Sequence, residues 1–82
     1  MPPQVGINVY ISKLRNMFKN KMISKGYDPK LVELALRLAD RWIKELAMYY
    51  SNGLPWLYTA IYRAKYIDAL RVAERWLEEV SK

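Results

Sequence analysis

The sequence of 82 residues contains no cysteine and no histidine. Without cysteine there can be neither a disulfide framework nor a thiolate metal site. Histidine is the commonest general base and the commonest metal ligand, so its absence removes the usual starting point for a catalytic or metal centre. The sequence also lacks a phosphate-cradling glycine loop and a calcium-loop pattern. We therefore expect no enzyme activity, no cofactor and no metal.

Long apolar runs and a leader pattern are also missing. No stretch approaches the roughly 18 uninterrupted apolar residues of a membrane span. The start, Met-Pro-Pro-Gln-Val-Gly, lacks the basic-then-apolar order of a secretory signal. These absences predict a cytoplasmic protein. A chain of this length fits one domain, near the lower size limit of independent folding. We expect a single helical domain at 7–82, after a loose N-terminal tail at 1–6.

Glycine and proline are few, and all of them fall within residues 2–6, 26–29 and 53–55. Because the stretches between these clusters contain neither residue, the pattern predicts helices at about 8–25, 29–50 and 55–80. Gly26 suits a left-handed C-cap, and Asp28 before Pro29 supplies an N-cap followed by proline at the first helical position. The expected fold class is all-α, a compact bundle of three long helices.

Apolar residues recur with the helical period, and no segment alternates with a period of two. In the first segment the stripe consists of Ile7, Ile11, Leu14, Phe18 and Met22, broadened by Tyr10 and Met17. The second segment confines its polar residues to a narrow band, which is typical of a helix that is central in a bundle or meets a second subunit. A third helix over 55–80 would be about 39 Å long and the first only about 27 Å. A break near 63–66, giving four helices, is therefore an alternative.

A twelve-residue segment occurs twice, at 35–46 and 69–80, with an offset of 34 positions. Seven of the twelve residues are identical, and four of the other five are conservative exchanges. Trp42 and Trp76 stand at equivalent places, where we expect them to be core or interface anchors. A repeat of this period is typical of stacked helical units.

The second copy resembles part of a known repeat family, and the composition of the whole chain gives a further resemblance. Residues 66–77, Tyr-Ile-Asp-Ala-Leu-Arg-Val-Ala-Glu-Arg-Trp-Leu, resemble the second helix of a tetratricopeptide repeat, and 60–65 resemble the end of that family's first helix. The offset of 34 equals the family's period. Ala64 stands where the family usually has glycine between the helices. The resemblance, over residues 60–80, implies a helix pair that binds peptides or proteins. With one Gln, one Thr and many Lys, Arg, Glu, Tyr and Ile, the composition resembles small proteins of hyperthermophilic archaea.

Acidic residues are missing from the first 27 positions. Residues 1–30 carry six basic side chains and one acidic one, whereas residues 31–82 are nearly balanced. Such asymmetry indicates contact with a nucleic acid, an anionic membrane or an acidic protein. The simplest alternative is a solvated lysine face. The candidate nucleic-acid-binding residues, which would lie against phosphates, are Lys13, Arg15, Lys19, Lys21 and Lys25.

Aromatic side chains are the other candidates for binding. Tyr58, Tyr62 and Tyr66 lie one helical turn apart, and such a ridge either grips a peptide, stacks bases or completes the bundle. The candidate protein-interface residues are Trp42, Tyr49, Tyr50, Trp56, Tyr58, Tyr62 and Tyr66. We expect a non-catalytic protein–protein interaction or assembly module with an unknown protein partner, or one that self-associates through residues 31–50. The alternatives are low-specificity binding of DNA or RNA through the first helix, and binding to a membrane surface.

Overall fold

Three α-helices make up the described part of the chain. The computed structural model describes residues 5–82, with side chains from Val9 onward. Its helices are α1 (Val5–Ser24), α2 (Pro29–Ser51) and α3 (Pro55–Val80). The predicted all-α class and the three helices are confirmed, with boundaries shifted by at most three residues. Helix α3 runs unbroken through 63–66, so residues 5–82 form three helices and not four. Most of the predicted tail at 1–6 lies outside the described residues, and α1 already begins at Val5.

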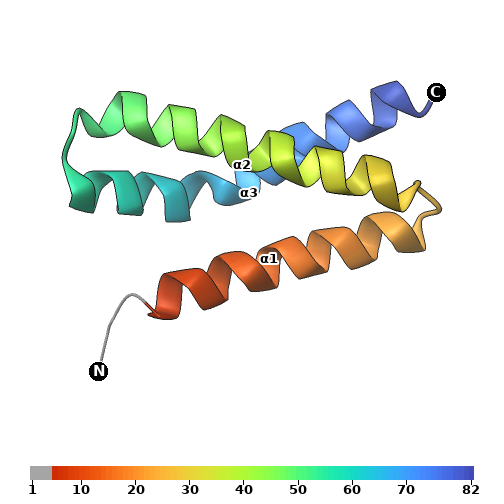
Figure 1. Ribbon diagram of the computed structural model, residues 1–82, viewed down its shortest axis with the longest axis horizontal. Coiled ribbons are helices and arrows are strands. Elements are labelled where there is room, and N and C mark those ends of the chain that lie inside the picture. The colour runs from red at the N-terminus through yellow and green to blue at the C-terminus, as the bar shows by residue number, and fades with distance from the viewer. Residues whose placement is uncertain (1–4) are drawn as a thin grey trace.

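Helices α2 and α3 form an antiparallel pair that crosses at a shallow angle, and α1 runs along one side of it (Figure 1). Packing is much closer between α2 and α3 than between α1 and either of them. The Cα atoms extend over 40 × 29 × 16 Å, so the molecule is flat. In this flat arrangement α1 covers only part of the apolar surface of α2 and α3.

Both turns follow the stop-and-restart pattern expected from glycine and proline. Gly26 has a φ of +96°, and the N–H of Tyr27 donates to the carbonyl of Met22 at 3.2 Å, which closes the C-terminal end of α1. The Asp28 carboxylate then accepts a hydrogen bond of 2.9 Å from the N–H of Lys30 and caps α2. In the second turn Asn52 takes the left-handed conformation before Gly53, and α3 begins without a side-chain cap.

The two copies of the repeat form the seam between α2 and α3. Positions 35, 36, 39 and 43 of the first copy are buried, and so are the equivalent positions 69, 70, 73 and 77 of the second. Four of these residues are alanines, which allow the two backbones to approach closely, and the larger side chains pack around them. The similarity of the two copies at buried positions therefore has a packing cause. The buried set is Ala35, Leu36, Ala39, Ile43, Ala69, Leu70, Ala73 and Leu77.

Helix α1 docks on this pair through a narrow apolar stripe. Phe18 and Met22 are buried, and Ile11 and Leu14 are half-buried against the core. The predicted stripe is confirmed at these four positions, while the side chain of Ile7 lies outside the described residues. Met17 is 59% exposed, so the stripe is narrower than the sequence pattern indicates.

Candidate functional site

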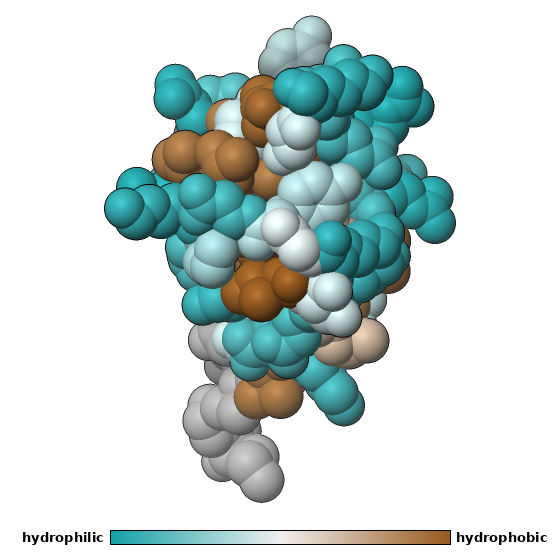
Figure 2. Space-filling view, turned by 90° about the vertical axis from the view of Figure 1, so that its right-hand side faces the viewer, coloured by the Kyte–Doolittle hydropathy of each residue, from teal (hydrophilic) through white to brown (hydrophobic). Residues whose placement is uncertain are grey.

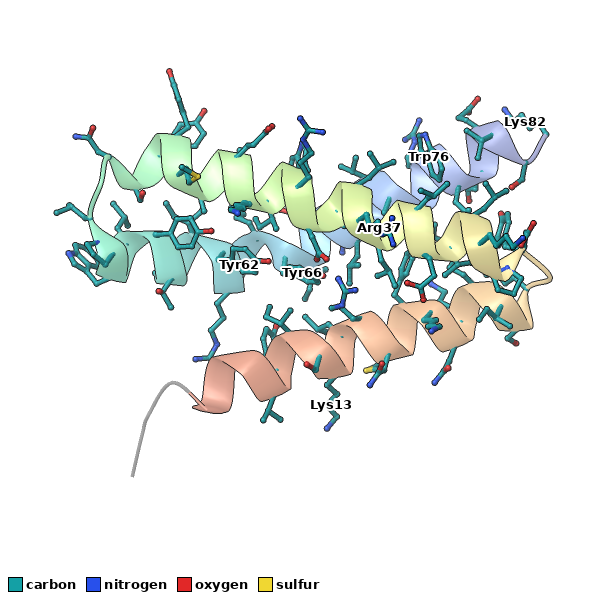
Figure 3. All side chains as sticks on the ribbon, in the orientation of Figure 1. Lys13, Arg37, Tyr62, Tyr66, Trp76 and Lys82 are labelled. Atoms are coloured by element: carbon teal, nitrogen blue, oxygen red, sulfur yellow. The ribbon has the colours of Figure 1, made fainter. Side chains whose placement is uncertain are left out.

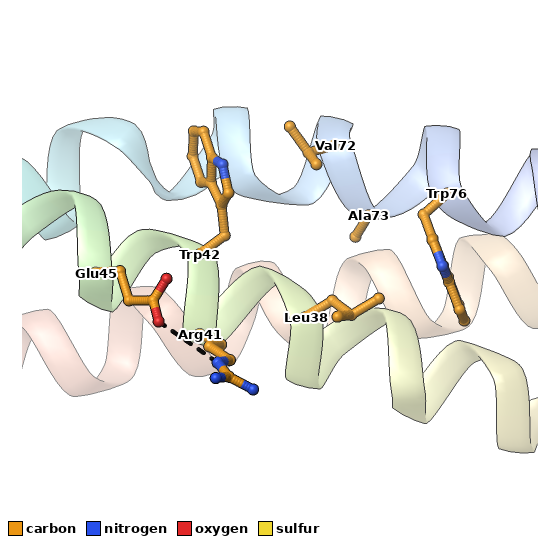
Figure 4. A pocket seen from close by; sticks show the side chains of 7 residues that line it. All are labelled: Leu38, Arg41, Trp42, Glu45, Val72, Ala73 and Trp76. Carbon is orange, nitrogen blue, oxygen red and sulfur yellow. Dashed lines mark hydrogen bonds and ion pairs between the residues drawn. The ribbon is translucent and has the colours of Figure 1, made fainter.

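An open apolar groove runs over the α2–α3 pair. It has a volume of about 300 Å³ and is lined by Leu38, Arg41, Trp42, Glu45, Val72, Ala73 and Trp76. Figure 4 shows Trp42 at one end and Trp76 at the other, with Leu38 between them. Arg41 and Glu45 form the α2 rim and make an ion pair of 3.5 Å. The groove thus has an apolar floor between two indole rings.

The groove faces away from α1. Asp40 on α2 points toward α1, and Trp42, two positions later, is rotated by about 200° around the helix. On α3 the same relation holds, because Glu74 is ion-paired with α1 and Val72 lies two positions earlier. Figure 3 likewise shows Trp76 on the side of the helix pair remote from α1. No other helix of the described chain covers this surface.

The exposure of its apolar side chains also indicates that no other helix covers this surface. Leu38 is 42% exposed, Val72 46% and Trp42 36%, although all three lie beside buried core residues. By contrast, the end of the molecule with the α1–α2 turn is mostly hydrophilic, with hydrophobic side chains in separate patches (Figure 2). Contiguous apolar surface on a folded domain marks an interaction site more often than isolated exposed residues do.

No family model matches this chain, and no curated protein or solved structure is significantly similar to it. What the site does is therefore inferred from its own geometry and chemistry.

The predicted interface residues fall into separate places. Trp42 lies in the groove, whereas Tyr49 and Tyr50 lie outside it, 78% and 61% exposed, with ring centroids 5.0 Å apart. Trp56 is also exposed and lies beside another hollow, which includes Arg63. The structure therefore does not bring the predicted aromatic residues together into one surface.

The tyrosine ridge of α3 lies largely inside the molecule. Tyr62 stacks on Tyr66 with a centroid distance of 5.7 Å, and Tyr58 follows at 5.9 Å from Tyr62. Tyr66 is fully buried and is thus a core residue of the single subunit. It can be buried because its hydroxyl donates a hydrogen bond to the Asp40 carboxylate and accepts one of 3.2 Å from Arg15.

Arg15, Asp40 and Tyr66 form a polar network with one side chain from each helix (Figure 3 labels Tyr66). Burial raises the pKa of the Tyr66 phenol, and its hydrogen bond to Asp40 raises it further. Burial alone would lower the pKa of Arg15, but the hydrogen bonds with Tyr66 and Asp40 outweigh it, so this pKa is raised. Among the described residues no buried side-chain nitrogen or oxygen lacks a partner. Because Arg15 comes from α1 and its two partners come from α2 and α3, the network holds α1 against the α2–α3 pair.

The basic residues of α1 point in different directions. Lys19 pairs with Glu33 of α2 at 2.8 Å, and this contact lowers the pKa of Glu33. Lys21 and Lys25 both pair with Glu74 of α3, at 4.0 and 3.3 Å. Arg15 belongs to the partly buried network with Asp40 and Tyr66, and Lys13 points away from the other helices (Figure 3). The five candidate nucleic-acid-binding residues thus do not form one continuous face.

The sequence predictions cover the α2 side of the groove better than its α3 side. Leu38, Arg41, Trp42 and Glu45 fall within the predicted self-association segment 31–50, and Trp76 is an expected core or interface anchor, whereas Val72 and Ala73 are not among the predicted interface residues. The signal that identifies Val72 is the repeat, because Leu38 is equivalent to Val72 and Trp42 to Trp76. Within the described residues, no helix is long and apolar enough to cross a membrane, and no group of three metal-ligating side chains gathers.

Proposed function

We propose that this chain is a non-catalytic helical module that binds a polypeptide through the groove between Trp42 and Trp76. The observation that supports this proposal most directly is the groove itself, which combines an apolar floor with two half-exposed tryptophans. Tryptophan and arginine are the residue types that most often dominate the energy of protein interfaces, and the rim provides Arg41. An open groove with an apolar floor is the kind of surface on which an amphipathic helix lays its apolar face.

The alternative, low-specificity nucleic-acid binding through α1, has less support. Four of its five candidate residues make ion pairs within the molecule, so a phosphate would have to compete with Asp40, Glu33 or Glu74. An anisotropy titration with labelled oligonucleotides separates the two proposals. Nucleic-acid binding requires micromolar affinity at low salt that is lost in a Lys19→Glu/Lys21→Glu variant.

Photocrosslinking tests the interaction module directly. A benzophenone amino acid placed at position 38, inside the groove, is compared with the same residue at position 17, on the exposed side of α1. We expect a defined polypeptide adduct, either with another protein or with a second copy, from position 38 only. The adduct should disappear when Trp76→Ala is added. Equal labelling from both positions would rule the proposal out.

A further inference from the structure

The groove has an internal two-fold relation. Leu38 and Val72 are equivalent positions of the repeat, 34 residues apart, and so are Trp42 and Trp76. One member of each pair comes from α2 and the other from α3, which run antiparallel. A half-turn about an axis perpendicular to the groove exchanges two antiparallel helices and brings each residue onto its equivalent. Accordingly, the two tryptophans close opposite ends of the groove (Figure 4).

Packing inside the subunit explains only the buried part of the repeat. Arg41 and Glu45 are exposed, and their equivalents Arg75 and Glu79 are identical and exposed as well. The α2–α3 seam does not require identical exposed residues on both of its edges. A partner that meets both helices in the same way accounts for them, because it then makes each contact twice.

We propose that the occupant of the groove is a second copy of this chain, so that α2 and α3 of two subunits form a four-helix core. This inference rests on the proposed function and names its partner. A two-fold dimer joins the same patch of both subunits, so the patch must be complementary to itself. A groove with equivalent sides meets this condition, because Trp42 of one subunit can fill the space beside Trp76 of the other.

The charges favour this partner over a strongly charged one. The chain as a whole carries +6, but the α2 rim of the groove carries one arginine and one glutamate, Arg41 and Glu45, and the exposed Arg75 and Glu79 occupy the equivalent positions of α3. Two copies of such a face meet without net repulsion, and each arginine can face a glutamate of the other subunit. The basic side chains of α1 lie on the opposite side, so they remain far apart in the dimer.

The size of the groove also points to side chains of a protein. Its volume of about 300 Å³ is at the lower end of the range for small-molecule pockets, and it is open along its length. The apolar surface continues beyond it at Leu34 and Val80, each 46% exposed. A second helix pair would cover all of this surface at once, which a small ligand would not.

The mass of the purified chain in solution tests the proposal. Sedimentation equilibrium from about 1 µM to about 1 mM, which spans the affinities of ordinary dimers, should give twice the 9.7 kDa of one chain. Leu38→Asp and the equivalent Val72→Asp should each raise the dissociation constant about 30-fold or more, because each buries a charge at the centre of the interface. Met17→Asp, on the exposed side of α1, is the matched control and should leave the mass doubled.

Single cysteines provide a measurement that does not depend on how the aspartate variants fold. The chain has no cysteine of its own, so Leu38→Cys and Val72→Cys each introduce one thiol. Near a two-fold axis the thiols of two subunits come within disulfide distance, and mild oxidation should give covalent dimers. Met17→Cys should stay a single chain under the same conditions.

The outcomes separate this inference from the proposed function. A single-chain mass at all concentrations, with no more disulfide dimer than Met17→Cys gives, would rule out a second copy as the occupant of the groove. If position 38 then still crosslinks another polypeptide, the interaction module stands with a different partner. If position 38 crosslinks nothing specific, both proposals are wrong.

Discussion

At the scale of single residues, Tyr66 connects the three helices. Its ring lies in the core, while its hydroxyl joins Asp40 of α2 and Arg15 of α1. A buried hydroxyl without partners would destabilise the fold, whereas one with both a donor and an acceptor adds net stability. Tyr66 therefore contributes through the burial of its ring, and its hydroxyl adds the contact between the three helices.

Replacing Tyr66 by Phe should lower the free energy of unfolding by about 1–2 kcal/mol, because Asp40 and Arg15 lose a hydrogen-bond partner in a partly buried place. Urea unfolding, followed by circular dichroism at one fixed protein concentration, measures the change. Tyr49→Phe, which removes an exposed hydroxyl, is the control and should have almost no effect. An equal loss in both variants would contradict a special role of the Tyr66 hydroxyl.

The raised pKa of Tyr66 also predicts a dependence of stability on pH. The folded state favours the neutral phenol, so this contribution is complete below the ordinary tyrosine pKa near 10 and is lost as the pH rises above it. Between about pH 10 and 12 the free energy of unfolding of the wild type should fall more steeply than that of Tyr66→Phe, by up to about 1.4 kcal/mol per pH unit. Parallel pH profiles would contradict the shift. Tyr62, whose pKa burial also raises, is present in both proteins.

At the scale of elements, the α2–α3 pair depends on small side chains at the repeated alanine positions. Ala39 and its equivalent Ala73 are each only 1% exposed, so the two helices leave no room for a larger side chain there. Helix propensity alone predicts the same small effect for an exchange of alanine for leucine at any helical position, because both are good helix formers. A larger effect at Ala39 or Ala73 would therefore report on packing.

Ala39→Leu should destabilise the fold by about 1–3 kcal/mol, because the added atoms must push α2 and α3 apart. Ala64→Leu makes the same exchange at an exposed position of α3 and should change stability by no more than about 0.5 kcal/mol. Thermal unfolding of the two variants beside the wild type gives the comparison. If Ala39→Leu is as stable as Ala64→Leu, the seam is looser than the structure indicates.

At the scale of the whole molecule, the two sides of the α2–α3 pair differ in how they are covered. On one side α1 adds Phe18, Met22 and a set of ion pairs. On the other side the groove is open and its edges are balanced in charge. Because the ion pairs between α1 and the pair are largely exposed, salt should weaken this docking more than it weakens the apolar α2–α3 seam.

Amide hydrogen exchange should therefore show α1 opening before α2 and α3. We expect lower protection in α1 at about 0.05 M salt and a further decrease at about 1 M, where the screening length falls to roughly 3 Å. Protection in the buried parts of α2 and α3 should change little over the same range. Mass spectrometry of peptic fragments provides the readout. Equal protection in all three helices at both salt concentrations would show that they open as one unit.

Much of the fold was predictable from local rules. The clusters at Gly26 and Gly53 marked the turns, and the apolar periods marked the buried faces, because backbone conformation and helical spacing are local properties. The candidate site was less predictable. Aromatic residues such as Tyr66 and Trp56 look alike in sequence, but one lies in the core and the other is exposed.

The sequence by itself determined the helical class, the positions of the two turns and the equivalence of the two repeat copies, because each depends on residue types and their spacing. It left open whether the third helix breaks near 63–66, and it placed the start of the first helix three residues late. Only the tertiary structure decided which side of α2 and α3 is covered by α1. That choice depends on contacts between distant residues, such as Arg15 with Asp40 and Lys25 with Glu74. Once α1 occupies one side, the repeat-equivalent residues on the other side are left as an open groove, because the chain as described has no further helix to cover them.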